Sequence, residues 1–231
     1  MEKLLVPSKI SYEESENKNK ATLIIEPCYF GYGTTLGNAL RRVLLSSLPG
    51  AAVTAVKIAG VDQEFSAIEN VKEDVLQICL KLKELRLKVY STEPVKLKLK
   101  VKGASKVTGA DFEKNSEVEI VNPDLVITEI TDKKGELDME ITVQQGRGYW
   151  PTEERSKEDI EIGTILLDSI FTPVRKVGYK VLATRVGEIT NYDKLEMEIE
   201  TDGTMSPQEA IEQASKLLID HFSLLTSKEE K

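Results

Sequence analysis

The sequence predicts an α+β protein, with helices near both ends of the chain and a strand-rich middle. Three observations support this class. Apolar residues recur at helical spacing in an early and in a late segment. A central segment instead alternates lysine with apolar residues. Turn residues divide the rest of the middle into short β-branched runs, which are typical of strands.

The first part of the chain is expected to form a strand, a glycine turn and a helix. The β-branched run Thr22–Pro27 predicts a strand that the proline ends. A turn at 31–33 follows, and a helix is expected from Thr34 or Thr35 to Leu48, since Pro49–Gly50 would end it. Its apolar stripe consists of Leu36, Leu40, Val43, Leu44 and Leu48.

The middle of the chain is expected to contain a second helix among strands. The helix is predicted over Val71–Leu85, with Glu73 and Asp74 in the first turn, where the helix dipole favours acidic side chains. Val95–Lys102 alternates with period two, which predicts a strand with one solvated face. Further strands are expected at 51–58, 117–121, 125–130, 137–143, 176–185 and 195–200, and a polar, acid-rich loop at 152–161.

The last helix has a complete start signal. Ser206 is the expected N-cap, Pro207 follows it, and Glu209 completes a capping box. Ile211, Ala214, Leu218, Phe222 and Leu225 form an apolar stripe, which Leu217 and Leu224 widen. Two interpretations stay open: the wide stripe packs entirely in the core, or one side of it packs on a second copy of the chain.

Composition excludes several classes of protein. The net charge of −8 over 231 residues, without a basic block, argues against a stand-alone nucleic-acid binder, although a local basic patch remains compatible with it. A single histidine, His221, and two cysteines, Cys28 and Cys79, exclude a zinc site of the usual spacing. Packing roles are expected for the two cysteines, and either packing or a charge near the helix C-terminus is expected for His221. No signal peptide or membrane span is predicted, so we expect a soluble cytoplasmic protein without metal or cofactor.

Two segments suggest alternative functions. The turn Gly31–Gly37 lies between a strand and a helix, the setting of a phosphate-binding loop. Leu36 stands where the dinucleotide pattern requires glycine, and the alternative is a tight turn that leads into the helix. Arg147, Tyr149 and Trp150 form a second candidate, because arginine and aromatic rings stack on bases in DNA-binding proteins.

The first helix also has a polar face. Asn38, Arg42 and Leu45 share this face, which is distinct from the apolar stripe. A solvated arginine pair at Arg41–Arg42 is one interpretation. A second protein partner is the other, since arginine favours ion pairs at interfaces.

The run Gly31–Gly50 resembles the signature of the alpha subunit of bacterial RNA polymerase, a resemblance that covers essentially the whole chain. It implies a discontinuous dimerisation domain, 1–49 with 173–231, in which two main helices pack on an antiparallel sheet, interrupted by a β-rich domain at 50–172. The other blocks that match in order are Gln63–Ser66, Val71–Asp74, Gln144–Pro151, Asp168–Val174 and Thr201–Thr204.

The resemblance implies an assembly subunit without catalytic residues. Two copies would dimerise and carry the β and β′ subunits, with ω and sigma in the holoenzyme, in a bacterial cytoplasm or, as an alternative, a plastid. The family's usual C-terminal DNA-binding domain is not expected here, and DNA binding is not carried over to these residues. The implied dimer contacts are Tyr32, Leu36, Leu40, Leu44, Leu218 and Phe222. The implied β contacts are Asn38, Arg42 and Leu45, and the implied β′ contacts are Lys83, Leu167, Val174 and Lys194, whereas Gln77 replaces the family's usual acidic residue.

Overall fold

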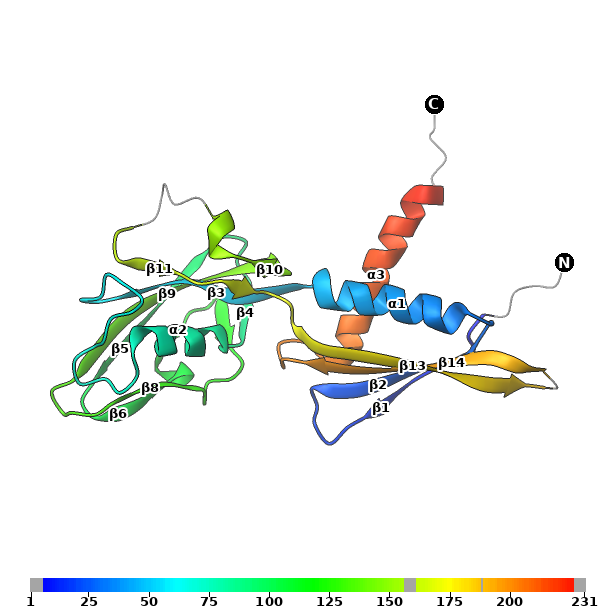
Figure 1. Ribbon diagram of the computed structural model, residues 1–231, viewed down its shortest axis with the longest axis horizontal. Helices are drawn as coiled ribbons and strands as arrows, with labels where there is room; N and C mark the ends of the chain where they lie inside the picture. Colours follow the sequence, from blue (N-terminus) through cyan, green and yellow to red (C-terminus); the bar gives the residue numbers. More distant parts are fainter. Residues whose placement is uncertain (1–5, 156–160, 188, 227–231) are drawn as a thin grey trace, which may run out of the picture. The chain divides into compact units, whose positions relative to one another are not determined.

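The structure, a computed structural model, describes residues 6–155, 161–187 and 189–226. The chain divides into two compact units. We call Met1–Leu48 with Thr172–Lys231 the terminal unit, and Pro49–Phe171 the inserted unit. The described residues form three α-helices and a larger number of strands, so the α+β class is confirmed with a stronger strand content than its name suggests (Figure 1).

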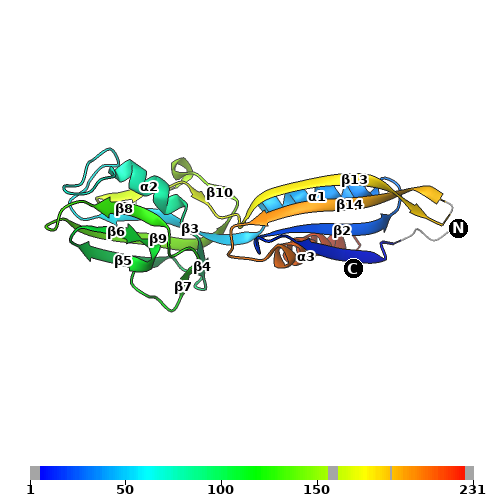
Figure 2. The same ribbon diagram turned by 90° about the horizontal axis from the view of Figure 1, so that it is seen from below.

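The terminal unit is an antiparallel sheet with two helices on one of its faces (Figure 2). The strand order is β1-β2-β14-β13. Helix α1 packs on β13 and β14, helix α3 packs on β14 and β2, and the two helices contact each other. The elements are β1 (Lys9–Glu14), β2 (Lys20–Cys28), α1 (Tyr32–Ser46), β13 (Val174–Val186), β14 (Ile189–Thr201) and α3 (Pro207–Thr226).

The core of the terminal unit lies between the sheet and the helices. Leu23 and Ile25 on β2 pair with Met197 and Leu195 on β14, and all four side chains are buried. The same cluster includes Leu40, Leu44, Ile211 and Ala214 from the helices. Burial of each large aliphatic side chain contributes about 1.5–3 kcal/mol. The alternation along two central strands therefore decides which face of the sheet the helices cover.

Two predicted boundaries near α1 were wrong. Pro27 does not end its strand, because it lies where the register between β2 and β14 shifts and no ladder hydrogen bond is needed. Helix α1 begins at Tyr32, before the predicted threonines, and ends at Ser46. Gly31 precedes it with φ 81°, a left-handed conformation that favours glycine.

Two glycines let α1 approach the sheet closely. A Cβ at Gly37 would lie 2.7 Å from the ring of Tyr179, and one at Gly33 would lie 2.9 Å from Val181. Both contacts are shorter than atoms tolerate without movement of the neighbour. Close packing against β13 thus explains the glycine spacing that resembled a phosphate-binding loop.

Gly37→Ala is expected to lower the free energy of unfolding by about 1–3 kcal/mol, because the added methyl group overpacks the contact with Tyr179. Gly178→Ala is the matched control, since a Cβ there meets no atom within 4 Å. Urea denaturation of both variants measures the difference. Equal stability of the two variants would contradict the packing argument.

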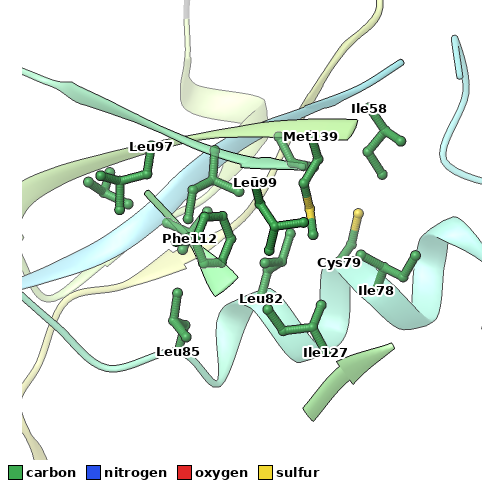
Figure 3. Packing of buried hydrophobic residues seen from close by; sticks show 14 of the residues in the cluster. Ile58, Ile78, Cys79, Leu82, Leu85, Leu97, Leu99, Phe112, Ile127 and Met139 are labelled. Carbon is green, nitrogen blue, oxygen red and sulfur yellow. The ribbon is translucent and has the colours of Figure 1, made fainter. Parts of the chain in front are cut away.

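The inserted unit contains a four-stranded sheet of order β11-β3-β9-β5 and three two-stranded pairs, β4-β7, β6-β8 and β10-β12. Helix α2 packs on β3 and β8. Figure 3 shows its apolar core, where Leu82 and Cys79 on α2 face Leu99 and Met139 on the sheet. The elements are β3 (Pro49–Ile58), α2 (Val75–Lys83), β4 (Leu87–Val89), β5 (Val95–Lys102), β6 (Ser105–Thr108), η1 (Gly109–Asp111), β7 (Val118–Ile120), β8 (Val126–Ile130), β9 (Glu136–Arg147), β10 (Tyr149–Trp150), η2 (Thr152–Glu154), β11 (Thr164–Leu166) and β12 (Ser169–Ile170).

The alternating strand is confirmed at its predicted bounds, 95–102. Its apolar residues are buried apart from the partly buried Val101, and its lysines are exposed. The lysines pair with carboxylates of the neighbouring strand, as in Lys100 with Asp138 at 2.7 Å and Lys102 with Glu136 at 3.0 Å. Exposed pairs of this kind each contribute little stability. The period-two pattern, in contrast, fixes which side of the strand faces the core.

Helix α2 is shorter than predicted at its start. Asp74 is its N-cap, and its carboxylate accepts a hydrogen bond from the Gln77 amide at 2.7 Å. Glu73 lies outside the helix and accepts from the Thr128 hydroxyl at 2.7 Å and from the Glu129 amide at 2.9 Å. The predicted first turn is therefore a connection to β8. The capping box of α3 is confirmed, since the Glu209 amide donates to Ser206 Oγ at 3.2 Å and the Ser206 amide donates to Glu209 at 2.9 Å.

Candidate functional site

The amides at the start of α1 already bind a carboxylate of the same chain. Asp193 Oδ2 on β14 accepts from the Gly31 amide at 2.9 Å and from the Gly33 amide at 3.1 Å. These are the groups that would hold a phosphate, and Asp193 also matches the positive end of the helix dipole. The arrangement argues against a phosphate site at the Gly31–Gly37 turn.

The aromatic loop of the inserted unit is likewise engaged. The Arg155 guanidinium lies 4.2 Å from the centroid of the Trp150 ring, and Nη1 donates to the Thr54 carbonyl at 2.6 Å. Nη2 donates to Ser169 Oγ at 2.8 Å. One face of Trp150 is thus covered, although Tyr149 remains exposed. Stacking of bases on this loop has little structural support.

Arg155 is a residue that the sequence analysis missed. It lies in the segment predicted as a polar, acid-rich loop, yet it is buried, and this burial lowers the pKa of the guanidinium. Asp168 lies nearby, and a hydrogen bond from the Thr152 amide at 2.9 Å lowers the pKa of its carboxyl group. The available signal was a single arginine just after the only tryptophan.

The polar face of α1 lies over β13. Asn38 and Arg42 are exposed, whereas Leu45 is partly buried against the core. The Tyr179 hydroxyl donates to Asn38 Oδ1 at 2.8 Å, which directs the amide nitrogen of Asn38 away from that contact. Arg41 Nε donates to the Val177 carbonyl at 3.2 Å. The face therefore offers hydrogen-bond donors from Asn38 and Arg42 to a partner.

The six residues suggested as dimer contacts divide into two groups. Tyr32 is 46% exposed and Phe222 is 59% exposed, while Leu36 and Leu218 are partly buried. Leu40 and Leu44 are 6% and 0% exposed. A side chain without exposed surface has no area for a second copy to cover. The structure thus places Leu40 and Leu44 in the core of the terminal unit, and we correct their assignment to an interface.

An exposed apolar surface remains on the terminal unit. Only the first half of α3 has buried residues, and its last turns extend away from the sheet (Figure 1). Exposure of single apolar side chains is ordinary, but a concentration of them marks an interaction site. On α3 the exposed apolar residues are Ile219, Phe222, Leu224 and Leu225, and Phe30 and Tyr32 are exposed at the start of α1; we call these six residues the apolar surface. The sequence analysis missed Phe30 and Ile219.

The residues suggested as β′ contacts also differ in exposure. Leu167 and Val174 are 3% and 4% exposed, so their side chains support the core instead of offering contact area. Lys83 lies in the inserted unit, with Nζ 3.4 Å from Asp168. Lys194 lies in the terminal unit, and its hydrogen bond to Glu196 at 2.8 Å raises the pKa of its ammonium group. Among these four suggested β′ contacts, Lys83 and Lys194 are the ones that place a charge at the surface.

The remaining candidate residues have structural surroundings. Cys28 and Cys79 are buried free thiols, as predicted, and burial raises the pKa of Cys79 to about 11. His221 Nδ1 lies 2.8 Å from the Leu217 carbonyl, within one turn of α3. None of the helices in the described part of the chain has the length and apolar character needed to cross a membrane.

Comparison with known proteins identifies the family. A model of the RNA polymerase Rpb3/RpoA insert domain matches residues 56–172. The DNA-directed RNA polymerase subunit alpha of Oceanobacillus iheyensis is 49% identical over 218 residues, which cover 94% of this chain and 69% of that relative. The same subunit of Alkaliphilus metalliredigens is 48% identical over 220 residues, which cover 95% of this chain and 70% of that relative. The chain therefore belongs to the family of bacterial DNA-directed RNA polymerase alpha subunits.

Proposed function

We propose that this chain is the non-catalytic assembly subunit of a bacterial RNA polymerase. The terminal unit acts as a dimerisation domain, and the dimer carries the β and β′ subunits, with ω and sigma joining in the holoenzyme. Because a bacterial polymerase works on DNA in the cytoplasm, we place the chain there as well. Nucleotide addition belongs to the larger subunits, and the chain needs no cofactor of its own.

The observation that carries this proposal is the apolar surface. Phe222, Leu224 and Leu225 are 59%, 73% and 80% exposed on the second half of α3. Removal of apolar area from water contributes about 25 cal/mol per Å². A two-fold axis brings the same surface of a second copy against the first, so exposed residues of α3 in both copies would be covered by one symmetric contact.

The polar surfaces serve the larger subunits. A symmetric dimer presents Asn38 and Arg42 twice, so two equivalent faces are available to β. Lys83 and Lys194 supply surface charge for β′. Because the two copies begin as equivalents, the order of addition and the contact between β and β′ must distinguish them.

Sedimentation equilibrium of the isolated chain tests the proposal. We expect twice the chain mass at micromolar concentration. A monomer throughout that range would contradict the proposed dimer, whatever the larger subunits do.

Arg42→Ala is expected to leave the dimer intact and to weaken capture of β by about tenfold or more, because an arginine at an interface core is often a dominant contact. A pull-down with tagged β measures this effect. Lys106→Ala, an exposed substitution in the inserted unit, is the control. Unchanged capture by Arg42→Ala would remove this residue from the proposed β contact.

A further inference from the structure

The inserted unit contains a cavity of about 450 Å³. It lies between the edge strand β5, the turn η1 with the residues that follow it, and β7. None of the residues that line it belongs to the proposed contacts with a second copy, β or β′. Small-molecule sites in proteins have volumes of roughly 300–1,000 Å³, so this cavity is large enough for a small organic ligand.

The cavity has an apolar floor and an aromatic rim. Leu97, Phe112 and Val118 line it and are buried, so the floor is continuous with the core of the inserted unit. Tyr90 also lines it, but its side chain is exposed and therefore lies at the rim. The Tyr90 hydroxyl donates to Glu119 Oε2 at 3.0 Å, which holds the ring in place. A flat ring that enters the cavity meets apolar surface below and an aromatic ring at the rim.

One wall of the cavity is an open strand edge. The Tyr90 amide donates to the Glu117 carbonyl at 2.8 Å, so the main chain of Glu117 faces β4. Main-chain groups alternate in direction along an antiparallel strand, and those of Ile120 therefore point away from β4. Ile120 lines the cavity, and no strand among the described residues pairs with that side of β7, beyond an isolated bridge at Val118. A ligand at this wall meets the amide and the carbonyl of Ile120 side by side.

The charged groups around the cavity oppose an anionic ligand. Glu113 and Glu119 line it together with Lys114. A phosphate group is held by several cations or by a helix N-terminus, and here it would meet a single lysine beside two carboxylates. Transfer of a charged group out of water also costs free energy that only an opposite charge offsets. The lining therefore favours a neutral ligand without phosphate.

We propose that this cavity binds a small, neutral, planar heteroaromatic molecule, such as a free nucleobase. The ring lies between the apolar floor and Tyr90, and its polar edge contacts the main chain of Ile120. Such an edge carries a donor and an acceptor side by side, which match the carbonyl and the amide of Ile120. Burial of the ring supplies affinity, and the two hydrogen bonds supply specificity. The inference goes beyond the proposed function and does not depend on it.

A small molecule suits this edge better than an added peptide strand does. Strand β7 has only three residues, Val118–Ile120, and the bridge to Asn115 already engages the first of them. Strands in globular proteins are usually about five or six residues long, because a short ladder provides few hydrogen bonds. The single open position at Ile120 is sufficient for one ring and insufficient for a strand.

Titration of the whole chain with 7-azaindole and with indole tests the inference. The two probes have the same shape, but 7-azaindole adds a ring acceptor beside the N–H donor. Amide chemical shifts of the isotope-labelled chain report where and how tightly each probe binds. We expect both probes to shift the Ile120 amide. We expect 7-azaindole to bind about two- to tenfold more tightly than indole, which is the effect of one further hydrogen bond.

Tyr90→Ala should weaken the binding of 7-azaindole by about two- to tenfold, because the ligand loses the aromatic ring at the rim. Tyr149→Ala is the matched control, since it removes an exposed tyrosine outside the cavity in the same unit, and it should bind as the wild type does. Equal affinity for the two probes, an unshifted Ile120 amide, or unchanged binding by Tyr90→Ala would overturn the inference.

A comparison of adenine with adenosine monophosphate tests the preference for a neutral ligand. We expect the nucleotide to bind no more tightly than the base, because its phosphate would lie near Glu113 and Glu119. Tighter binding of the nucleotide would overturn the assignment to a neutral molecule. Sedimentation equilibrium with and without adenine should give the same mass, so failure of this inference is distinct from failure of the proposed dimer.

Discussion

Phe222→Asp is expected to convert the dimer into a folded monomer. Phe222 is 59% exposed in the single chain, so the substitution removes nothing from the core of its own unit. In a dimer it would place an unpaired carboxylate in an apolar contact, at a cost of at least about 3 kcal/mol. The dissociation constant should rise more than 100-fold, since each 1.4 kcal/mol is a factor of ten. Sedimentation equilibrium measures the mass, and circular dichroism checks the fold.

Lys216→Asp is the matched control for this variant. It places a new carboxylate on the same helix, at an exposed position that contacts Glu212. The exposed pair with Glu212 contributes little, so this variant should remain a dimer. A stable dimer formed by Phe222→Asp would show that the apolar surface on α3 is not where two copies meet.

Leu44→Asp is expected to unfold the terminal unit instead of separating two intact copies. Leu44 is 0% exposed and lies in an apolar cluster. A carboxylate at this buried position cannot reach water, so the free energy of unfolding should fall by more than about 4 kcal/mol. Thermal denaturation followed by circular dichroism measures the loss.

Thr35→Asp on the same helix is the control for Leu44→Asp. Thr35 is exposed in the first turn of α1, where the helix dipole favours a negative charge. This variant should keep the wild-type melting temperature within a few degrees. Native stability of Leu44→Asp would contradict the assignment of Leu44 to the core.

The contrast between Phe222 and Leu44 shows what helical periodicity in the sequence can and cannot predict. Helical spacing correctly predicts that both residues belong to apolar stripes. It does not distinguish an apolar side chain that the same chain covers from one that another copy covers. That distinction depends on where the sheet ends beneath each helix, which is a tertiary property. Leu40 and Leu44, which the resemblance implies as dimer contacts, are buried within the single chain.

Local signals predicted elements that depend only on their own residues. The alternation of β5 and the Ser206–Glu209 capping box both formed as expected. The start of α2 did not, because Glu73 bonds Thr128 on a strand more than fifty residues later. Asp193 at the start of α1 and Arg155 beside Trp150 are also long-range contacts. No spacing within a short window of sequence indicates such partners.

The central claim is that two copies of this chain form the platform on which β and β′ assemble. Co-expression of the three chains, followed by size-exclusion chromatography with light scattering, tests it most directly. The account predicts one complex that contains two copies of this chain with one β and one β′. A complex with a single copy, or elution of this chain apart from β and β′, would contradict the account.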